Sequence, residues 1–341
     1  MSTSDRRAEL EAAIDATPCD RELYEVYADE LQRLGDPRGE LIALQLADPT
    51  PDREEQARAL IATHDLEPGA PLCDLSWEWG FVKSAEVDLL TAADPDLVRG
   101  ALDHPSLRFL GSITLLHVET GLQVAIDALA SGPRRALHQI DIGGLRIGSE
   151  LPAEACDIGV LDALWRQVPD LYSLGIRGQN MSLGKLELPR LRSLELSSIS
   201  LRDDVVASVV AEPWNNLWML DLEFGHANPA IADLERLLAH PFPSLTSLWL
   251  DGNFIDDLVE PLARSRLLDE LGRLALAGGL TDRGAAMLAK HADAFARIQT
   301  LDLSHNYLSA KAIERVQGIA REVLTSNQEE PVERDPDLYD Y

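Results

Sequence analysis

Residues 245–250 read Leu-Thr-Ser-Leu-Trp-Leu, and residues 298–303 read Ile-Gln-Thr-Leu-Asp-Leu. Each segment has an apolar residue at its first, fourth and sixth positions. In an extended strand the fourth and sixth side chains point to one side, while the residue between them points to the other side. The pattern therefore predicts a short strand with one buried face and one open face.

The same pattern recurs along most of the chain. Its copies begin at Val82, Leu110, Leu137, Leu171, Leu191, Leu217, Leu245, Leu271 and Ile298. The intervals range from 20 to 34 residues and average about 27, and the residues between copies change to helical spacing. So many copies in near-register predict an array of strand–helix units.

This array resembles leucine-rich repeats, and its unit length is similar to the ribonuclease-inhibitor type. Residues 280–289 (LTDRGAAMLA) are close to that family's strand-to-helix phrase, and Asn253 and Asn306 stand at the asparagine position of the repeat. The resemblance implies an α/β solenoid, curved as a horseshoe, with parallel strands inside and helices outside. We expect the array to cover residues 81–326.

Three segments of the array have sequences that predict specific local structure. The step from Leu171 to Leu191 is too short for a strand and a helix, so we expect residues 180–189 to form an extended turn. Asn228 is expected to be a helix N-cap that is followed by a first-turn proline. Ser309 is expected to start an amphipathic helix that closes the array and runs to Leu324.

The first 80 residues have a different pattern, with helices expected over 6–16, 20–35, 39–47 and 53–65. Residues 22–45 are similar to the repeat-companion domain that precedes leucine-rich repeats, chiefly in myxobacteria and planctomycetes. The matching residues are Tyr27, Ala28, Asp29, Leu31, Gly35, Asp36, Pro37, Arg38, Gly39, Glu40, Ile42, Leu44 and Gln45, whereas Glu30 replaces the usual Trp. The resemblance implies a small, all-helical domain over residues 1–80 that caps the array. It implies no chemical activity, and we expect Arg38 to pair locally with a carboxylate.

The chain carries 58 acidic and 30 basic residues, a formal charge of -28. This balance excludes a nucleic-acid binder and a protein that docks on anionic lipid, because both need a basic surface. No apolar leader or membrane span is evident, so the sequence favours a cytoplasmic protein. Residues 327–341 carry six acids and one arginine and are expected to form a disordered acidic tail.

No catalytic motif, metal-ligand spacing or phosphate-binding loop is present in the sequence. We therefore expect no enzymatic activity, no cofactor and no metal. Cys19, Cys73 and Cys156 are far apart and have no base nearby in the sequence, so we expect them to be small buried apolar residues.

The open face of the predicted strands is the candidate binding surface. Exposed aromatic and arginine side chains are typical anchors of protein interfaces, and carboxylates around them favour a basic or Arg-rich partner. We expect Trp218 and Trp249, on neighbouring strands, to lie within contact range. The candidate residues are Tyr172, Arg192, Glu195, Trp218, Asp221, Glu223, Trp249 and Asp251.

The sequence therefore predicts a non-enzymatic scaffold or adaptor that binds another protein, and neither a nucleic acid nor a membrane, through this face. An alternative is an inhibitor or immunity protein that covers a cationic toxin or enzyme, which rests on likeness to the ribonuclease-inhibitor type. A second alternative is a regulator of a small GTPase, which no residue pattern in the sequence supports.

Overall fold

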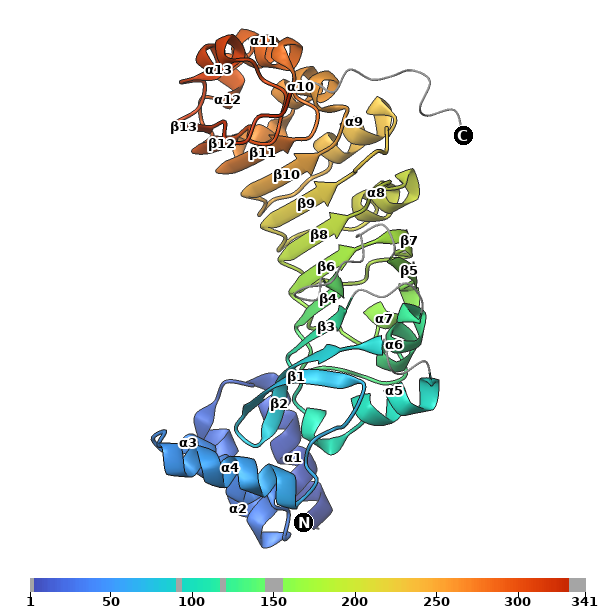
Figure 1. Cartoon of the computed structure of the whole chain (residues 1–341), viewed down its shortest axis with the longest axis vertical. Helices are drawn as coiled ribbons and strands as arrows, with labels where there is room; N and C mark the ends of the chain where they lie inside the picture. The colour runs from blue at the N-terminus through green and yellow to red at the C-terminus, as the bar shows by residue number, and fades with distance from the viewer. Residues whose placement is uncertain (1–2, 90–93, 117–120, 145–155, 331–341) are drawn as a thin grey trace. The chain divides into compact units, whose positions relative to one another are not determined.

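The computed structural model describes residues 3–89, 94–116, 121–144 and 156–330, and the fold is mixed α/β (Figure 1). The chain divides into two compact units, Met1–Arg190 and Leu191–Tyr341. In each unit, most of the strands pair side by side and in parallel in chain order, and helices connect most of them. Each unit therefore has a solenoid-like arrangement.

The first unit begins with the four helices predicted from the sequence. They are α1 (Thr3–Ala16), α2 (Arg21–Arg33), α3 (Arg38–Leu46) and α4 (Pro51–Thr63). Asp20 caps α2 by accepting hydrogen bonds from two backbone amides, and Thr50 caps α4 by accepting one, from the amide of Arg53. Between α2 and α3, the Asp36 carboxylate pairs with Arg38 as expected, with Nε to Oδ1 at 2.9 Å.

Residues 72–78 form a strand, so the prediction that the first 80 residues are all helical is wrong. This strand, β1 (Leu72–Glu78), pairs antiparallel with β2 (Phe81–Val87). The turn between them uses Trp79 and Gly80, whose φ angles of 49° and 79° suit a tight hairpin. The sequence search missed β1 because its simple alternation of apolar and polar residues lacks the spacing of the parallel strands.

Three further strands of the first unit extend the sheet of β2 in parallel and in chain order. They are β3 (Ser112–Leu116), β4 (Gln139–Gly144) and β6 (Ser173–Arg177). Helices α5 (Pro95–Leu102), α6 (Leu122–Leu129) and α7 (Asp162–Trp165) and the 3-10 turn η2 (Pro105–Leu107) lie between them in the sequence. The short step before Leu191 is more than an extended turn, because β7 (Gln179–Ser182) pairs there with β5 (Asp157–Val160).

The helices and the first repeats of this unit share one core. Tyr24 and Tyr27 of α2 are fully buried beside Phe81 and Phe109, and the Phe81 and Phe109 rings meet edge to face at 4.7 Å. Aromatic pairs of this geometry add to the gain from burial. The helices are therefore fixed to the segments that begin the repeats.

The second unit contains six parallel strands in the part that the structure describes. They are β8 (Ser193–Ser197), β9 (Met219–Glu223), β10 (Ser247–Asp251), β11 (Arg273–Ala277), β12 (Thr300–Asp302) and β13 (Glu322–Leu324). The helices are α8 (Asp203–Val210), α9 (Ile231–Ala239), α10 (Ile255–Ala263), η4 (Arg266–Asp269), α11 (Asp282–Lys290), α12 (Ala292–Phe295) and α13 (Ala310–Val316). Helix α9 has Ala230 as its N-cap, so the N-cap predicted at Asn228 is two residues too early.

Register places equivalent residues of neighbouring repeats side by side. Leu220 of β9 is opposite Leu248 of β10, which is opposite Leu274 of β11, and each is at most 1% exposed. Because side chains alternate along a strand, the residues between these leucines lie on the opposite face. Burial of the leucine rows therefore fixes which side chains form the open face.

The two asparagines at the repeat position have different environments. Asn306 is fully buried, accepts hydrogen bonds from the amides of Gly279 and Leu280, and donates to the carbonyl of Leu276 at 2.6 Å. Asn253 is exposed. The equivalence predicted for the two residues is therefore wrong in structural terms.

The end of the array differs from the single closing helix that was predicted. Ser309 caps α13 as expected, but α13 ends at Val316 and Gly318 follows with a φ of 82°. That conformation ends a helix at low cost only for glycine. Residues 322–324 then add β13 to the sheet, parallel to β12.

The first residues of the predicted acidic tail are attached to the last repeat. The amide of Glu329 donates to the carbonyl of Asn306 at 2.7 Å, and the Gln328 side chain donates to the carbonyl of Leu303 at 2.9 Å. The rest of the tail, residues 331–341, lies outside the described residues.

Candidate functional site

Seven of the eight candidate residues lie in the second unit, on or next to β8, β9 and β10. Glu195 is in β8, Asp221 and Glu223 are in β9, and Trp249 and Asp251 are in β10; Arg192 and Trp218 come directly before β8 and β9. The eighth, Tyr172, comes before β6 in the first unit. We call the seven residues of the second unit, together with Arg273 and Asp302 described below, the inner-face site.

Strand register places the central residues of this site in two rows. Glu195 is opposite Asp221, which is opposite Trp249. One step further along the strands, Glu223 is opposite Asp251. The alternation that was predicted from the sequence therefore brings an aromatic ring and four carboxylates onto one small area of the sheet.

Trp249 is 36% exposed and is partly covered by Arg273, a residue that the sequence search did not select. The Arg273 guanidinium carbon lies 5.0 Å from the centre of the Trp249 ring, and its Nη2 is 3.2 Å from Oδ2 of Asp302. Cation–π contact and the ion pair together orient both side chains. Arg273 is the third residue of its copy of the repeat pattern, whereas Trp249 is the fifth residue of the preceding copy.

Trp218 is 46% exposed, but the predicted contact with Trp249 is wrong. Trp218 precedes the first residue of β9, and its carbonyl accepts the amide of Thr246 at 3.0 Å. It therefore lies level with Thr246, three residues before Trp249, which corresponds to roughly 10 Å along a strand. The two rings occupy separate places on the surface.

The paired acids at the ends of β9 and β10 have an unusual environment. Burial raises the pKa of Asp251, and the negative charge of Glu223 opposite raises it further, whereas nearby His305 acts in the other direction. The Glu223 carboxylate accepts a hydrogen bond from the Ser197 hydroxyl. Two carboxylates this close repel each other, so this end of the site favours a positive group.

In the first unit, Tyr172 is 40% exposed and stacks on His138 of the neighbouring repeat. The ring centres are 4.8 Å apart and the planes are inclined by 23°. His138 occupies the same position of its repeat as Tyr172, which the sequence pattern shows, but only the register makes the two rings neighbours.

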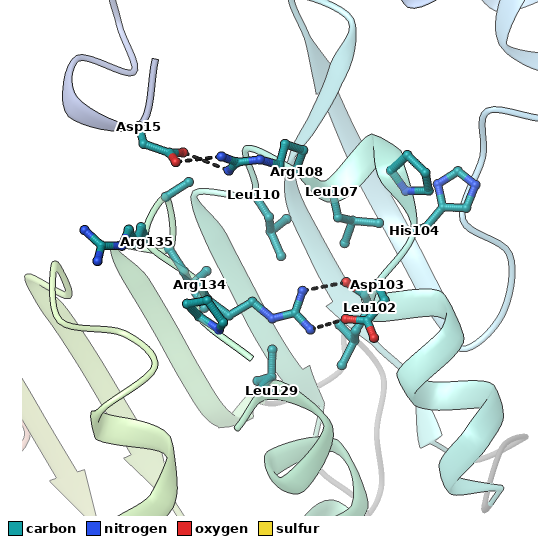
Figure 2. Close-up of a pocket in the computed structure, with 14 residues that line it drawn as sticks. Asp15, Leu102, Asp103, His104, Leu107, Arg108, Leu110, Leu129, Arg134 and Arg135 are labelled. Carbon is teal, nitrogen blue, oxygen red and sulfur yellow. Dashed lines mark hydrogen bonds and ion pairs between the residues drawn. The ribbon is translucent and has the colours of Figure 1, made fainter. Parts of the chain in front are cut away.

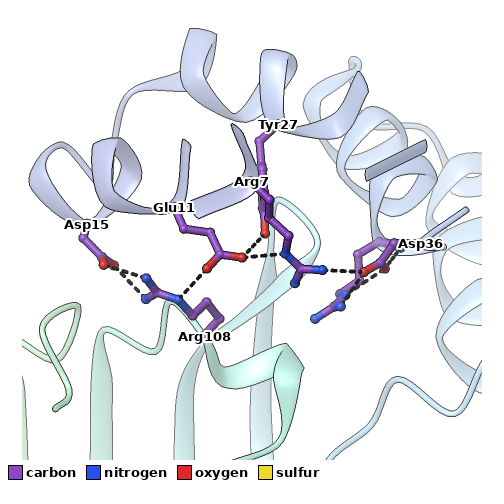
Figure 3. A network of polar contacts seen from close by, with 7 residues as sticks. Arg7, Glu11, Asp15, Tyr27, Asp36 and Arg108 are labelled. Carbon is purple, nitrogen blue, oxygen red and sulfur yellow. Dashed lines mark hydrogen bonds and ion pairs between the residues drawn. The ribbon is translucent and has the colours of Figure 1, made fainter. Parts of the chain in front are cut away.

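Charged residues of α1 form a network with Tyr27 of α2 and with Arg108 (Figure 3). Glu11 accepts from Arg7 at 2.8 Å and from the Tyr27 hydroxyl at 2.7 Å. Arg108 lies just before β3 and makes two hydrogen bonds to Asp15, of 2.8 and 2.7 Å. The pKa of Glu11 is lowered by these partners although burial opposes the change. The charges are satisfied by one another, as expected for a structural role.

A hollow of about 480 Å³ lies beside this network, and Arg108, Arg134 and Asp15 form part of its wall (Figure 2). Arg134 donates to the Leu102 carbonyl and to Asp103 at 2.8 and 2.6 Å. Arg108 and Arg134 are thus occupied by acceptors of the chain itself.

Among residues 3–89, 94–116, 121–144 and 156–330, no group of histidine, cysteine and acidic side chains has the geometry of a metal site. The expected burial of the cysteines is correct for Cys156 but wrong for Cys19, which is exposed. No helix within those ranges is both long enough and apolar enough to cross a membrane.

No family model and no curated protein matches the sequence. Among solved structures, a protein from Bacteroides fragilis is similar over 82% of this chain and 84% of its own, with a TM-score of 0.63 and 23% identity. An internalin from Listeria monocytogenes aligns over 64% of this chain and 67% of its own, with a TM-score of 0.31 and 12% identity. The first of these likenesses concerns the fold alone.

Proposed function

We propose that the chain is a non-enzymatic scaffold or adaptor, and that its leucine-rich repeats bind another protein through the inner-face site. The observation that carries the proposal is Trp249, a large ring that is 36% exposed in the middle of a strand. Exposed tryptophan and arginine on a rigid sheet are typical of interface anchors, because little side-chain freedom is lost when a partner covers them.

The acids around Trp249 favour a partner with a basic or Arg-rich surface. Glu195, Asp221, Glu223 and Asp251 surround the ring, whereas Arg273 is already paired with Asp302. A cationic partner would relieve the repulsion between Glu223 and Asp251 and would be steered by the field of the face.

We also propose that the repeats curve as a horseshoe and that α1–α4 cap their first strand. A solenoid exposes the apolar layer of its terminal repeat unless another element covers it. Contacts of Tyr24 and Tyr27 with Phe81 and Phe109 support this role.

The acidic rows support a second candidate function, an inhibitor that covers the active site of a cationic enzyme. The two functions require the same binding face and differ in the partner. A captured partner that loses its activity in the complex favours the inhibitor, and one that keeps it favours the scaffold.

The test is affinity capture from a lysate of the source organism, followed by mass spectrometry. We expect the variant with Trp249→Ala and Asp221→Ala to lose partners that the natural chain retains. The matched control carries Leu97→Ala and Glu235→Ala, which remove an exposed apolar and an exposed acidic side chain from helices α5 and α9. The proposal is wrong if all three chains capture the same proteins equally well.

A further inference from the structure

β1 is an edge strand of the first unit. In the described part of the chain it pairs only with β2, so its other edge presents main-chain amide and carbonyl groups that no neighbouring strand uses. Such an edge is a template for another extended segment. A bulge between Cys73 and Ser76, where Asp74 has a φ of 46°, separates the start of the strand from Ser76–Glu78, and a second irregularity in the pairing with β2 lies between Ser76 and Trp77.

The residues of β1 lie beside a groove. Cys73, Leu75 and Trp77 are partly exposed and alternate with the exposed Asp74, Ser76 and Glu78. Two hollows of about 500 and 470 Å³ lie between β1 and α4, and the walls of both include Arg58, Ile61 and Trp77. Because they share these walls, the two hollows adjoin, and we call them together the β1 groove.

The floor of the groove is firm and apolar. The Trp77 side chain packs against the buried cluster of Leu41, Ala57 and Leu66. Trp79 follows in the hairpin turn, where Gln45 accepts the amide of Gly80 at 2.7 Å and so fixes the turn to α3. A side chain that enters the groove would meet aromatic and aliphatic surface without displacing the core.

The charges around the groove select its occupant. Its lining includes four acids, Glu54, Glu67, Asp74 and Glu78, and two arginines, Arg53 and Arg58. Both arginines already donate to backbone carbonyls of the chain, to Asp48 at 2.6 Å and to Glu54 at 3.3 Å. The groove is therefore net acidic, which disfavours the chain's own acidic tail and a second copy of this chain, whose formal charge is -28.

We propose that the free edge of β1 binds an extended segment of a partner protein in which apolar and basic residues alternate. The segment adds a short strand beside Ser76–Glu78, its apolar side chains enter the groove against Trp77 and Ile61, and its basic side chains reach Glu78 and Asp74. This surface belongs to the first unit and does not depend on the inner-face site.

The probe for the test is the capped peptide Ac-Lys-Val-Lys-Val-Lys-Val-NH₂, added to the full chain with its tryptophans labelled with nitrogen-15. The six tryptophans give separate reporters for the two surfaces. We expect the indole signals of Trp77 and Trp79 to shift with saturation while those of Trp218 and Trp249 stay in place. A peptide with serine in place of valine keeps the charge, and one with alternate N-methyl amides blocks strand pairing; both should bind more weakly.

Variants of the chain complete the test. Glu78→Lys should weaken binding of the probe by roughly fivefold, about 1 kcal/mol. The control is Glu55→Lys, which changes an exposed residue of α4 that does not line the groove and should alter binding by less than about twofold. Shifts confined to Trp218 and Trp249, equal binding of the serine peptide, or no binding at millimolar probe would each overturn the proposal.

Discussion

At the scale of single residues, the buried side-chain amide of Asn306 connects two neighbouring repeats by hydrogen bonds. Its side chain accepts from two backbone amides and donates to carbonyls of two repeats. We expect Asn306→Ala to lower the free energy of unfolding of the second unit by about 2–4 kcal/mol, since buried donors and acceptors lose their partners. Urea denaturation measures this change. The control is Asn253→Ala, which changes an exposed asparagine at the same position of the repeat pattern and should alter stability by less than about 0.5 kcal/mol. Equal effects of the two substitutions would contradict this view.

Lys83 is a residue whose pKa differs between the folded and the unfolded chain. Its amine donates to the Tyr24 hydroxyl and lies 4.7 Å from the centre of the Tyr24 ring, and no carboxylate in the described chain lies within ion-pair distance. Burial lowers the pKa of Lys83 to about 8 from 10.5 in the unfolded chain. Between these values the unfolded state binds more protons, so stability should rise as the pH increases from 8 to 10.

The substitution Lys83→Met tests this reasoning. Below pH 8 it removes the cost of a buried charge, so we expect the variant to be more stable than the natural chain by about 1–3 kcal/mol. The gain should shrink as the pH rises towards 10. Chemical denaturation at pH 7, 8.5 and 10 measures the difference in stability. The control is Lys290→Met, which changes an exposed lysine of α11. A variant that is less stable at pH 7 would show that the Tyr24 contact outweighs the burial of the charge.

At the scale of elements, Gly39 sets how closely α2 and α3 approach. A Cβ on this residue would lie 2.6 Å from the Ala28 carbonyl oxygen and 2.7 Å from the Gln32 amide nitrogen, and both are backbone atoms that cannot turn aside. We expect Gly39→Ala to lower the free energy of unfolding by about 2 kcal/mol or more, and therefore to lower the melting temperature. Gly100→Ala in α5 meets no atom within 4 Å and should stabilise the chain by about 0.5–1 kcal/mol. Thermal melts of the two alanine variants should therefore move in opposite directions.

The elements also show which parts of the fold were predictable. The strands from β2 to β12 in the main sheet follow from leucine spacing, because burial of the fourth and sixth residues leaves one orientation for each strand. β1 and β13 could not be found in this way. β1 owes its place to a hairpin turn at Trp79 and Gly80, and β13 to the end of α13 at Gly318, both of which depend on positive φ angles.

The candidate site was predictable to a similar depth. Alternation placed Trp249 and Asp221 on the open face, and aligning the copies of the pattern gives the register, because Leu220 and Leu248 are both the fourth residues of their copies. Trp218 is the second residue of its copy and Trp249 is the fifth, so the alignment itself sets the two residues three positions apart. The sequence could not show that Arg273 covers Trp249 or that His138 stacks on Tyr172, because these contacts depend on side-chain conformations.

At the scale of the whole molecule, the charge of -28 makes opposing contributions to folding and binding. Like charges repel in the compact state, and the exposed ion pairs that could offset this are each worth only about 0–1 kcal/mol. Screening should therefore stabilise the fold. Between 20 and 300 mM NaCl, where the Debye length falls from roughly 20 to 6 Å, we expect the melting temperature to rise by a few degrees.

The same screening should weaken capture of a basic partner, because it reduces attraction to the inner-face site. Melting and capture measured in one salt series thus separate the two effects. A melting temperature that falls with salt would show that networks such as Arg108 with Asp15 outweigh the repulsion, and capture that strengthens with salt would show that the partner binds by apolar contact rather than by charge.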